Sequence, residues 1–203
     1  MKRMMDFMDD VSRHFAIGGG WALLALSFYI SIDVIGRKLF RISLQGSDEL
    51  GGYVMAVVCA MGFSYALAKR AHIRLNILLP RFPSGVQAAV NLFAYTALAV
   101  FSFMMAWLGW EMFAYSFELK AIAPTPLETP LWIPQGLWTL GLAWFFVHTA
   151  VYLFAIVVFL FKGRIRELNS IFGVETVDRQ VSKEIVESRV DRTGDREAES
   201  EGV

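Results

Sequence analysis

The sequence has little charge and a single cysteine, and both shortages limit what the protein can be. Only 19% of its 203 residues are charged, whereas a water-soluble domain usually carries about a quarter. The formal net charge is zero, so no excess of either sign predicts a nucleic-acid partner. Because Cys59 is alone, an intrachain disulfide and a cysteine-based metal cluster are excluded. Its apolar surroundings indicate a small packing residue.

Motifs for chemistry are also absent. The sequence has no Gly-rich nucleotide-binding loop, no nucleophile elbow, no pair of metal ligands on a helix and no paired carboxylates inside an apolar stretch. We therefore expect no catalytic, substrate-binding or metal-binding residue and no cofactor. The protein is predicted not to be an enzyme.

His148 is a polar residue inside an apolar stretch, where such a side chain needs a partner. We expect it to form an interhelical hydrogen bond. A second interpretation makes the protein a haem-bearing membrane anchor of an oxidoreductase, which would normally need another intramembrane histidine as axial ligand. His14 and His72 lie at helix borders or in loops, which favours the hydrogen bond.

Long apolar stretches are what the sequence has in abundance, since 56% of its residues are hydrophobic. A helix rises about 1.5 Å per residue, so roughly 20 apolar residues span a hydrocarbon core of about 30 Å. Four stretches qualify: Phe15 to Ile35, Leu50 to Ala68, Val86 to Trp110 and Ile133 to Phe161. We predict an all-α integral membrane protein with four transmembrane helices. Residues 1–161 form the membrane domain, and residues 162–203 form a charged, flexible cytoplasmic tail.

Basic residues near the ends of these stretches indicate orientation, because they favour the cytoplasmic side. Three groups would share one side: Lys2, Arg3 and Arg13; Lys69, Arg70, Arg74 and Arg81; Lys162, Arg164 and Arg166. Both termini are therefore expected in the cytoplasm. Arg37, Lys38 and Arg41 in the first loop break the pattern. We interpret Arg37 to Leu44 as a short amphipathic segment between the first and second helices, lying at the interface with its cations reaching water.

Small residues recur every fourth position in the second stretch, forming a ridge that lets another backbone approach closely. The members of the ridge are Gly52, Ala56, Ala60, Ser64 and Ala68. Two interpretations stay open at this point. The ridge either packs the four helices of this chain together or forms a docking face for another subunit.

Polar residues before the second stretch predict local structure. Ser47 is expected to cap that helix, with Asp48 and Glu49 complementing the helix dipole in its first turn. Asp33 and Arg37 lie four residues apart and are expected to pair on one helix face.

Prolines predict a stiff, extended loop before the fourth stretch, since each fixes φ and lacks a backbone donor. They are Pro124, Pro126, Pro130 and Pro134. Trp132 and Trp138 mark the outer start of the fourth helix, because such rings favour the headgroup level.

Four segments, taken in order, carry a family pattern: Ile32–Phe40, Gly46–Leu50, His72–Asn76 and the stretch from Pro124 to Pro134. Together they resemble the end of the first helix, the start of the second, the cytoplasmic loop and the outer loop of the DctQ-like family. This family is the small membrane subunit of tripartite ATP-independent periplasmic (TRAP) transporters. The family often has aspartate where this sequence has Asn76, and the tail from Lys162 lies outside the resemblance.

The resemblance implies a three-part system in the bacterial inner membrane. A periplasmic substrate-binding protein would capture an organic acid, such as a dicarboxylate or sialic acid, and a large membrane subunit would carry the sodium and substrate sites. The small subunit would be a non-catalytic scaffold whose partners are these two proteins and membrane lipids, with no nucleic acid. Candidate contacts with the large subunit are Arg37, Glu49, Gly52, Ala56, Ala60 and Ser64. Candidate contacts with the binding protein are Pro124, Pro126 and Trp132.

A small autonomous exporter is a further alternative. It would normally need an ionisable residue deep in a span, whereas Asp33 and Glu111 lie near the ends of their predicted helices.

Overall fold

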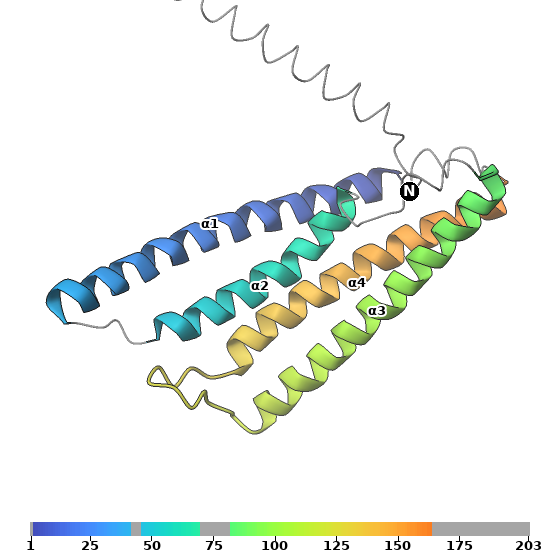
Figure 1. Cartoon of the computed structure of the whole chain (residues 1–203). Coiled ribbons are helices and arrows are strands. Elements are labelled where there is room, and N and C mark those ends of the chain that lie inside the picture. Colours follow the sequence, from blue (N-terminus) through green and yellow to red (C-terminus); the bar gives the residue numbers. More distant parts are fainter. Residues whose placement is uncertain (1, 42–45, 70–81, 164–203) are drawn as a thin grey trace, which may run out of the picture. The chain divides into compact units, whose positions relative to one another are not determined.

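The computed structural model describes residues 2–41, 46–69 and 82–163, which form four helices (Figure 1). These are α1 (Lys2–Phe40), α2 (Ser47–Ala68), α3 (Ser84–Glu118) and α4 (Trp132–Phe161). The only extended pairing among the described residues is an isolated antiparallel bridge between Ile122 and Pro130. Each helix is long and apolar enough to cross a membrane. The prediction of an all-α chain with four transmembrane helices is confirmed.

The first helix is longer than the sequence pattern predicted. It holds 39 residues, which at about 1.5 Å per residue gives roughly 58 Å, well beyond a hydrocarbon core of about 30 Å. Residues 37–40 of the expected amphipathic segment continue α1, and Arg41 (φ 57°) follows in the left-handed region. Arg37 and Lys38 lie in the last turn, where cations complement the carbonyl end of the helix. Residues 42–45 lie outside the described part.

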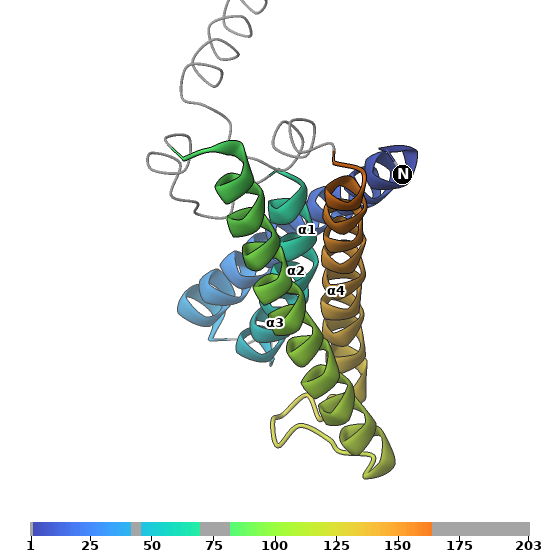
Figure 2. The same cartoon turned by 90° about the vertical axis from the view of Figure 1, so that its right-hand side faces the viewer.

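The chain divides into two compact units, one of Met1–His72 with Phe93–Ala155 and the other of Ile73–Leu92 with Ile156–Val203. In the first unit α2 lies between α1 and α4 (Figure 1), and α3 packs against α4, where Gly109 faces Leu142 and Gly136 faces Phe113. Figure 2 shows that α1 approaches α4 in its first part and then diverges from it. The first unit therefore contains parts of all four helices.

Small residues set the spacing between helices of the first unit. A Cβ atom added to Gly141 of α4 would lie 2.9 Å from the Cβ of Ala60 on α2, and one added to Gly19 of α1 would lie 2.9 Å from Val58 Cγ1. These distances are too short for any side chain. The two glycines therefore allow α1 and α4 to pack closely against opposite sides of α2.

The second unit includes the start of α3 and the end of α4. The carbonyl of Pro83 accepts hydrogen bonds from the amides of Val86 and Gln87, which begins α3. After α4, Gly163 adopts φ 65° and its N–H donates to the carbonyl of Leu160. The His72–Asn76 segment and residues 164–203, including Arg164 and Arg166, lie outside the described residues, so the expectations made for them stay predictions.

Candidate docking surface and its polar supports

The small-residue ridge of α2 divides into two halves. Ala60 and Ser64 are fully buried, with Ala60 packed against Gly141. Gly52 and Ala56 are exposed, and a Cβ added to Gly52 would meet nothing within 4 Å. We call Ala60 and Ser64 the buried half and Gly52 and Ala56 the exposed half. The buried half packs the helices of this chain, whereas the exposed half presents a small-residue surface to its surroundings.

Cys59 lies on the same exposed side of α2. It is a free thiol and is exposed in this chain. The interpretation of Cys59 as a residue packed inside the chain is therefore wrong. An apolar neighbourhood in the sequence could not reveal this, because in a membrane helix lipid-facing positions are as apolar as buried ones.

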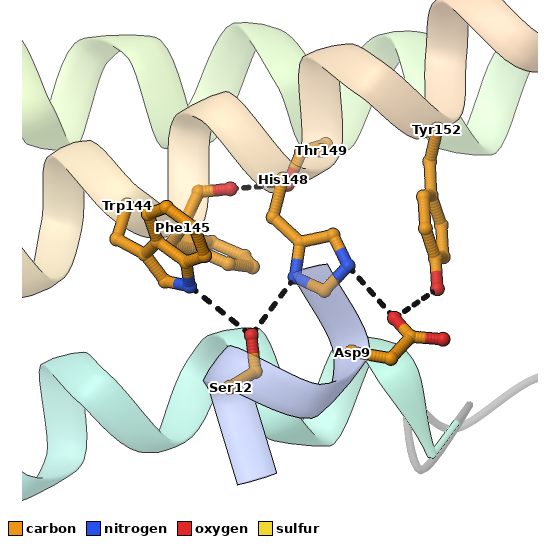
Figure 3. Close-up of polar contacts among 7 residues, drawn as sticks. All are labelled: Asp9, Ser12, Trp144, Phe145, His148, Thr149 and Tyr152. Atoms are coloured by element: carbon orange, nitrogen blue, oxygen red, sulfur yellow. Dashed lines mark hydrogen bonds and ion pairs between the residues drawn. The ribbon is translucent and has the colours of Figure 1, made fainter. Parts of the chain in front are cut away.

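A cluster of polar side chains joins the start of α1 to α4 (Figure 3). We call it the α1–α4 cluster; its members are Asp9, Ser12, Trp144, His148 and Tyr152. Trp144 Nε1 donates to Ser12 Oγ at 3.1 Å, and Ser12 Oγ lies 3.3 Å from His148 Nδ1. On the other side of the imidazole, His148 Nε2 lies 3.1 Å from Asp9 Oδ1, to which Tyr152 also donates at 2.6 Å. The predicted interhelical hydrogen bond of His148 is confirmed.

The direction of these bonds follows from what each group can do. An ionised carboxylate only accepts, so His148 Nε2 donates to Asp9, and in the neutral ring Nδ1 is then the acceptor of the Ser12 hydroxyl proton. Both ring nitrogens of His148 are thus engaged, and a role as haem ligand would require breaking one of these bonds. The described residues also contain no group of three His, Cys, Asp or Glu side chains that could hold a metal ion.

Ser12, His148 and Asp9 superficially have the composition of a nucleophilic triad. A nucleophilic serine must be reachable by substrate. Ser12 and His148 are both 0% exposed, and the Ser12 oxygen already accepts the Trp144 N–H. This arrangement therefore fixes α1 to α4 and provides no acyl-transfer chemistry.

A second group of polar residues lies at the start of α2. We call it the loop cluster; its members are Asp33, Arg37, Ser47, Glu49, Tyr53 and Thr125. The carboxylate of Asp33 is fully buried, and its Oδ2 lies 2.5 Å from Arg37 Nη2. Ser47 Oγ donates to the same oxygen at 2.7 Å. The predicted pairing of Asp33 with Arg37 is confirmed.

The predicted cap at Ser47 is wrong. Gly46, with φ 89°, precedes the helix at the N-cap position, and no side chain caps its amides. Ser47 instead donates to Asp33, whose fully buried carboxylate is stabilised by each hydrogen-bond donor that it gains. Asp48 and Glu49 do lie in the first turn of α2, as predicted.

Residues 119–131, here the 119–131 loop, are held against the start of α2. Glu49 accepts hydrogen bonds from Tyr53 and, across 76 positions of sequence, from Thr125. Leu127 covers Gly46, where an added Cβ would lie 3.0 Å from a Leu127 methyl. These contacts tie the loop to the α1–α2 connection. They were not predicted, because no residue spacing marks them.

The 119–131 loop folds back on itself. The amide of Ala123 donates to Thr129 and the amide of Leu131 to Ala121, each at 3.0 Å. The expectation of an extended connection is therefore wrong: Pro130 takes part in the pairing opposite Ile122, where the hydrogen bonds use the amides of Ala123 and Leu131 and none is needed from the proline. The candidate binding-protein contacts Pro124, Pro126 and Trp132 are all exposed.

A comparison with protein-family models matches residues 26–161 to DctQ, described as the DctQ component of tripartite ATP-independent periplasmic transporters. The chain belongs to the DctQ family. It is therefore a small permease component of a TRAP transporter and not an enzyme. DctQ proteins work with a large membrane subunit, DctM, and a periplasmic binding protein. No curated protein matches the chain.

The family match includes both halves of the α2 ridge and the whole loop cluster, but it begins after the first part of α1. Asp9 and Ser12 precede the matched residues, whereas Trp144, His148 and Tyr152 lie within them. The α1–α4 cluster therefore joins the DctQ-matching part of this chain to the residues before it.

Proposed function

We propose that this DctQ-family protein is the non-catalytic scaffold of a sodium-driven, binding-protein-dependent transporter for organic acids such as dicarboxylates or sialic acid. In this proposal the exposed half of the α2 ridge docks on the large membrane subunit. The protein lies in the bacterial inner membrane with both termini in the cytoplasm. Its partners are the large subunit, the binding protein and membrane lipids.

The single observation that carries the docking proposal is the division of the ridge. Two sides of α2 are already occupied, by α1 at Val58 and by α4 at Ala60. Gly52 and Ala56 remain exposed. In a bilayer, small residues give close backbone contact, which is the main way that one transmembrane helix attracts another.

The remaining candidate residues have supporting positions in this proposal. Arg37 keeps a side chain 46% exposed while it neutralises Asp33, so it can also meet a partner. The carboxylate of Glu49 is engaged by Thr125 and Tyr53, so we assign it to holding the 119–131 loop. That loop would present Pro124 and Pro126 to the binding protein, together with Trp132 at the adjoining start of α4. Ala60 and Ser64 act through packing inside this chain.

The docking proposal is tested by copurification. The tagged protein is extracted from its native membranes in mild detergent, and its partners are identified by mass spectrometry. We expect a much larger polytopic protein at stoichiometric ratio. Gly52→Leu and Ala56→Leu should reduce its yield several-fold, since each leucine holds the two backbones apart. The matched control is Ala22→Leu, at an exposed alanine of α1.

The outcomes separate two parts of the proposal. A homo-oligomer without a larger partner would refute the scaffold function. A partner retained equally by both α2 variants would exclude the exposed half of the ridge as the interface. With the complex in hand, uptake of a labelled organic acid into proteoliposomes should require the binding protein and a sodium gradient. Equal uptake without sodium would refute the proposed coupling.

A further inference from the structure

A groove lies between α3 and α4 of the first unit, on the side of the chain that bears the 119–131 loop. It has a volume of about 480 Å³ and an almost entirely apolar lining. Six of its lining residues define its shape: Trp110, Phe113, Trp132, Gly136, Leu140 and Ala143. Neither the α2 ridge nor the two polar clusters contribute to it.

The groove runs along the axis of α4. Its lining residues on that helix extend from Trp132 to Ala143. The ten helical steps from Ile133 to Ala143 rise about 15 Å, which is half of a hydrocarbon core of about 30 Å. The groove therefore has the direction and length of one acyl chain in a single leaflet.

The floor of the groove depends on small residues. A Cβ added to Gly136 would lie 3.1 Å from the ring of Phe113, so only glycine fits beside that ring without displacing it. Thr139 also lines the groove, but its hydroxyl donates to the carbonyl of Gly109 at 3.0 Å. The occupant is therefore offered no free hydroxyl donor at this depth and must be apolar.

Aromatic rings surround the end of the groove nearest the loop. Phe117 packs edge-on against Trp132 at this end, with ring centroids 5.9 Å apart. Such rings favour the headgroup level of a bilayer. Beyond Phe117, Glu118 and Lys120 are exposed. One carboxylate and one ammonium match the charges of a zwitterionic headgroup, which carries an amine and a phosphate.

From these observations we propose that the α3–α4 groove binds one acyl chain of a phospholipid with a zwitterionic amine headgroup, drawn from the leaflet on the side of the 119–131 loop. Its aromatic end lies at the headgroup level and its Ala143 end near the bilayer midplane. The occupant is a lipid because the groove matches half a bilayer in length and its loop end carries aromatic rings, with one carboxylate and one ammonium exposed on the chain just beyond them. This site is independent of the docking surface on α2.

The test uses the full chain extracted from native membranes in mild detergent, with bound lipid counted by native mass spectrometry. Ala143→Phe fills the deep end of the groove, and Ala25→Phe, at an exposed position of α1, is the matched control. We expect one retained phosphatidylethanolamine in the wild type and in Ala25→Phe. Ala143→Phe should lower its occupancy about tenfold, since the space of a few methylenes is lost.

A second readout keeps the proposal testable if Ala143→Phe folds poorly. Delipidated wild-type protein is mixed with phosphatidylethanolamine or phosphatidylglycerol carrying brominated chains, and quenching of tryptophan fluorescence is measured. We expect saturable quenching at lower concentration for phosphatidylethanolamine, and its loss in Leu140→Phe, which narrows the groove without adding a tryptophan. Equal lipid retention in all variants, equal affinity for both lipids, or crosslinking of position 143 to the large subunit would overturn the proposal.

Discussion

The two polar clusters lie near opposite ends of α1 and differ in how far they are closed to solvent. In the α1–α4 cluster, Ser12, His148 and Tyr152 are all buried, and the Asp9 side chain is 37% exposed. In the loop cluster, only the Asp33 carboxylate and Ser47 are buried, while Arg37 is 46% exposed and Glu49 is partly exposed. The depth at which a polar cluster is buried decides how much it contributes to stability. A polar group that loses its partner is destabilised most where water cannot replace that partner.

The two polar clusters have different roles at the two ends of α1. The α1–α4 cluster fixes where the first part of α1 lies, because α1 diverges from α4 beyond it (Figure 2). The loop cluster fixes the 119–131 loop on the start of α2 through Glu49 and Thr125. We expect changes in the first cluster to lower global stability and changes in the second to act mainly on the loop.

The largest effect is expected from His148→Leu. This change removes one donor from Asp9, which keeps Tyr152, and removes the Nδ1 partner of the buried Ser12 hydroxyl, and it should lower the free energy of unfolding by about 1–3 kcal/mol. Thermal unfolding of the purified protein in detergent measures it. Val147→Leu, at an exposed neighbouring position, is the control and should leave the midpoint unchanged. If His148→Leu were as stable as the wild type, the α1–α4 cluster would contribute no more to global stability than the loop cluster does.

A smaller effect is expected from Arg37→Ala. The buried Asp33 loses its cation but keeps Ser47 as a donor, and because Arg37 is 46% exposed, water can enter where the guanidinium was and replace part of its interaction with Asp33. We expect a loss of about 1 kcal/mol. Lys38→Ala, in the same last turn of α1, is the control and should change the unfolding midpoint little. If Arg37→Ala were more damaging than His148→Leu, depth of burial would not be the deciding factor.

Local features of this chain were readable from its sequence. The four spans follow from apolar length, and the Asp33–Arg37 pair follows from a separation of four residues on a helix. The start of α1 was missed because Asp6, Asp9 and Asp10 interrupt the apolar pattern. Charged side chains do not end a helix, because its backbone hydrogen bonds can continue past them. Asp9 and Ser12 could have been suspected from their spacing of three, which places both on one face.

Long-range partners could not be read in the same way. Asp9 and His148 are 139 positions apart, and Glu49 and Thr125 are 76 apart. No periodicity links such residues, and the sequence indicates only that a polar group near an apolar span needs some partner. The ridge shows the same limit. Its spacing marks Gly52, Ala56, Ala60 and Ser64 alike, and only the packing of Gly141 on Ala60 separates the two halves.

The smallest global effect is expected from Thr125→Val, which removes the hydroxyl that binds Glu49. The unfolding midpoint should stay near the wild-type value, because α2 and its contacts with α1 and α4 are unchanged. Hydrogen exchange should instead rise several-fold at the amides of Ala123 and Leu131, which close the 119–131 loop. Thr125→Ser keeps the hydroxyl and should restore slow exchange. Unchanged exchange in Thr125→Val would mean that Leu127 packed on Gly46 holds the loop without Glu49.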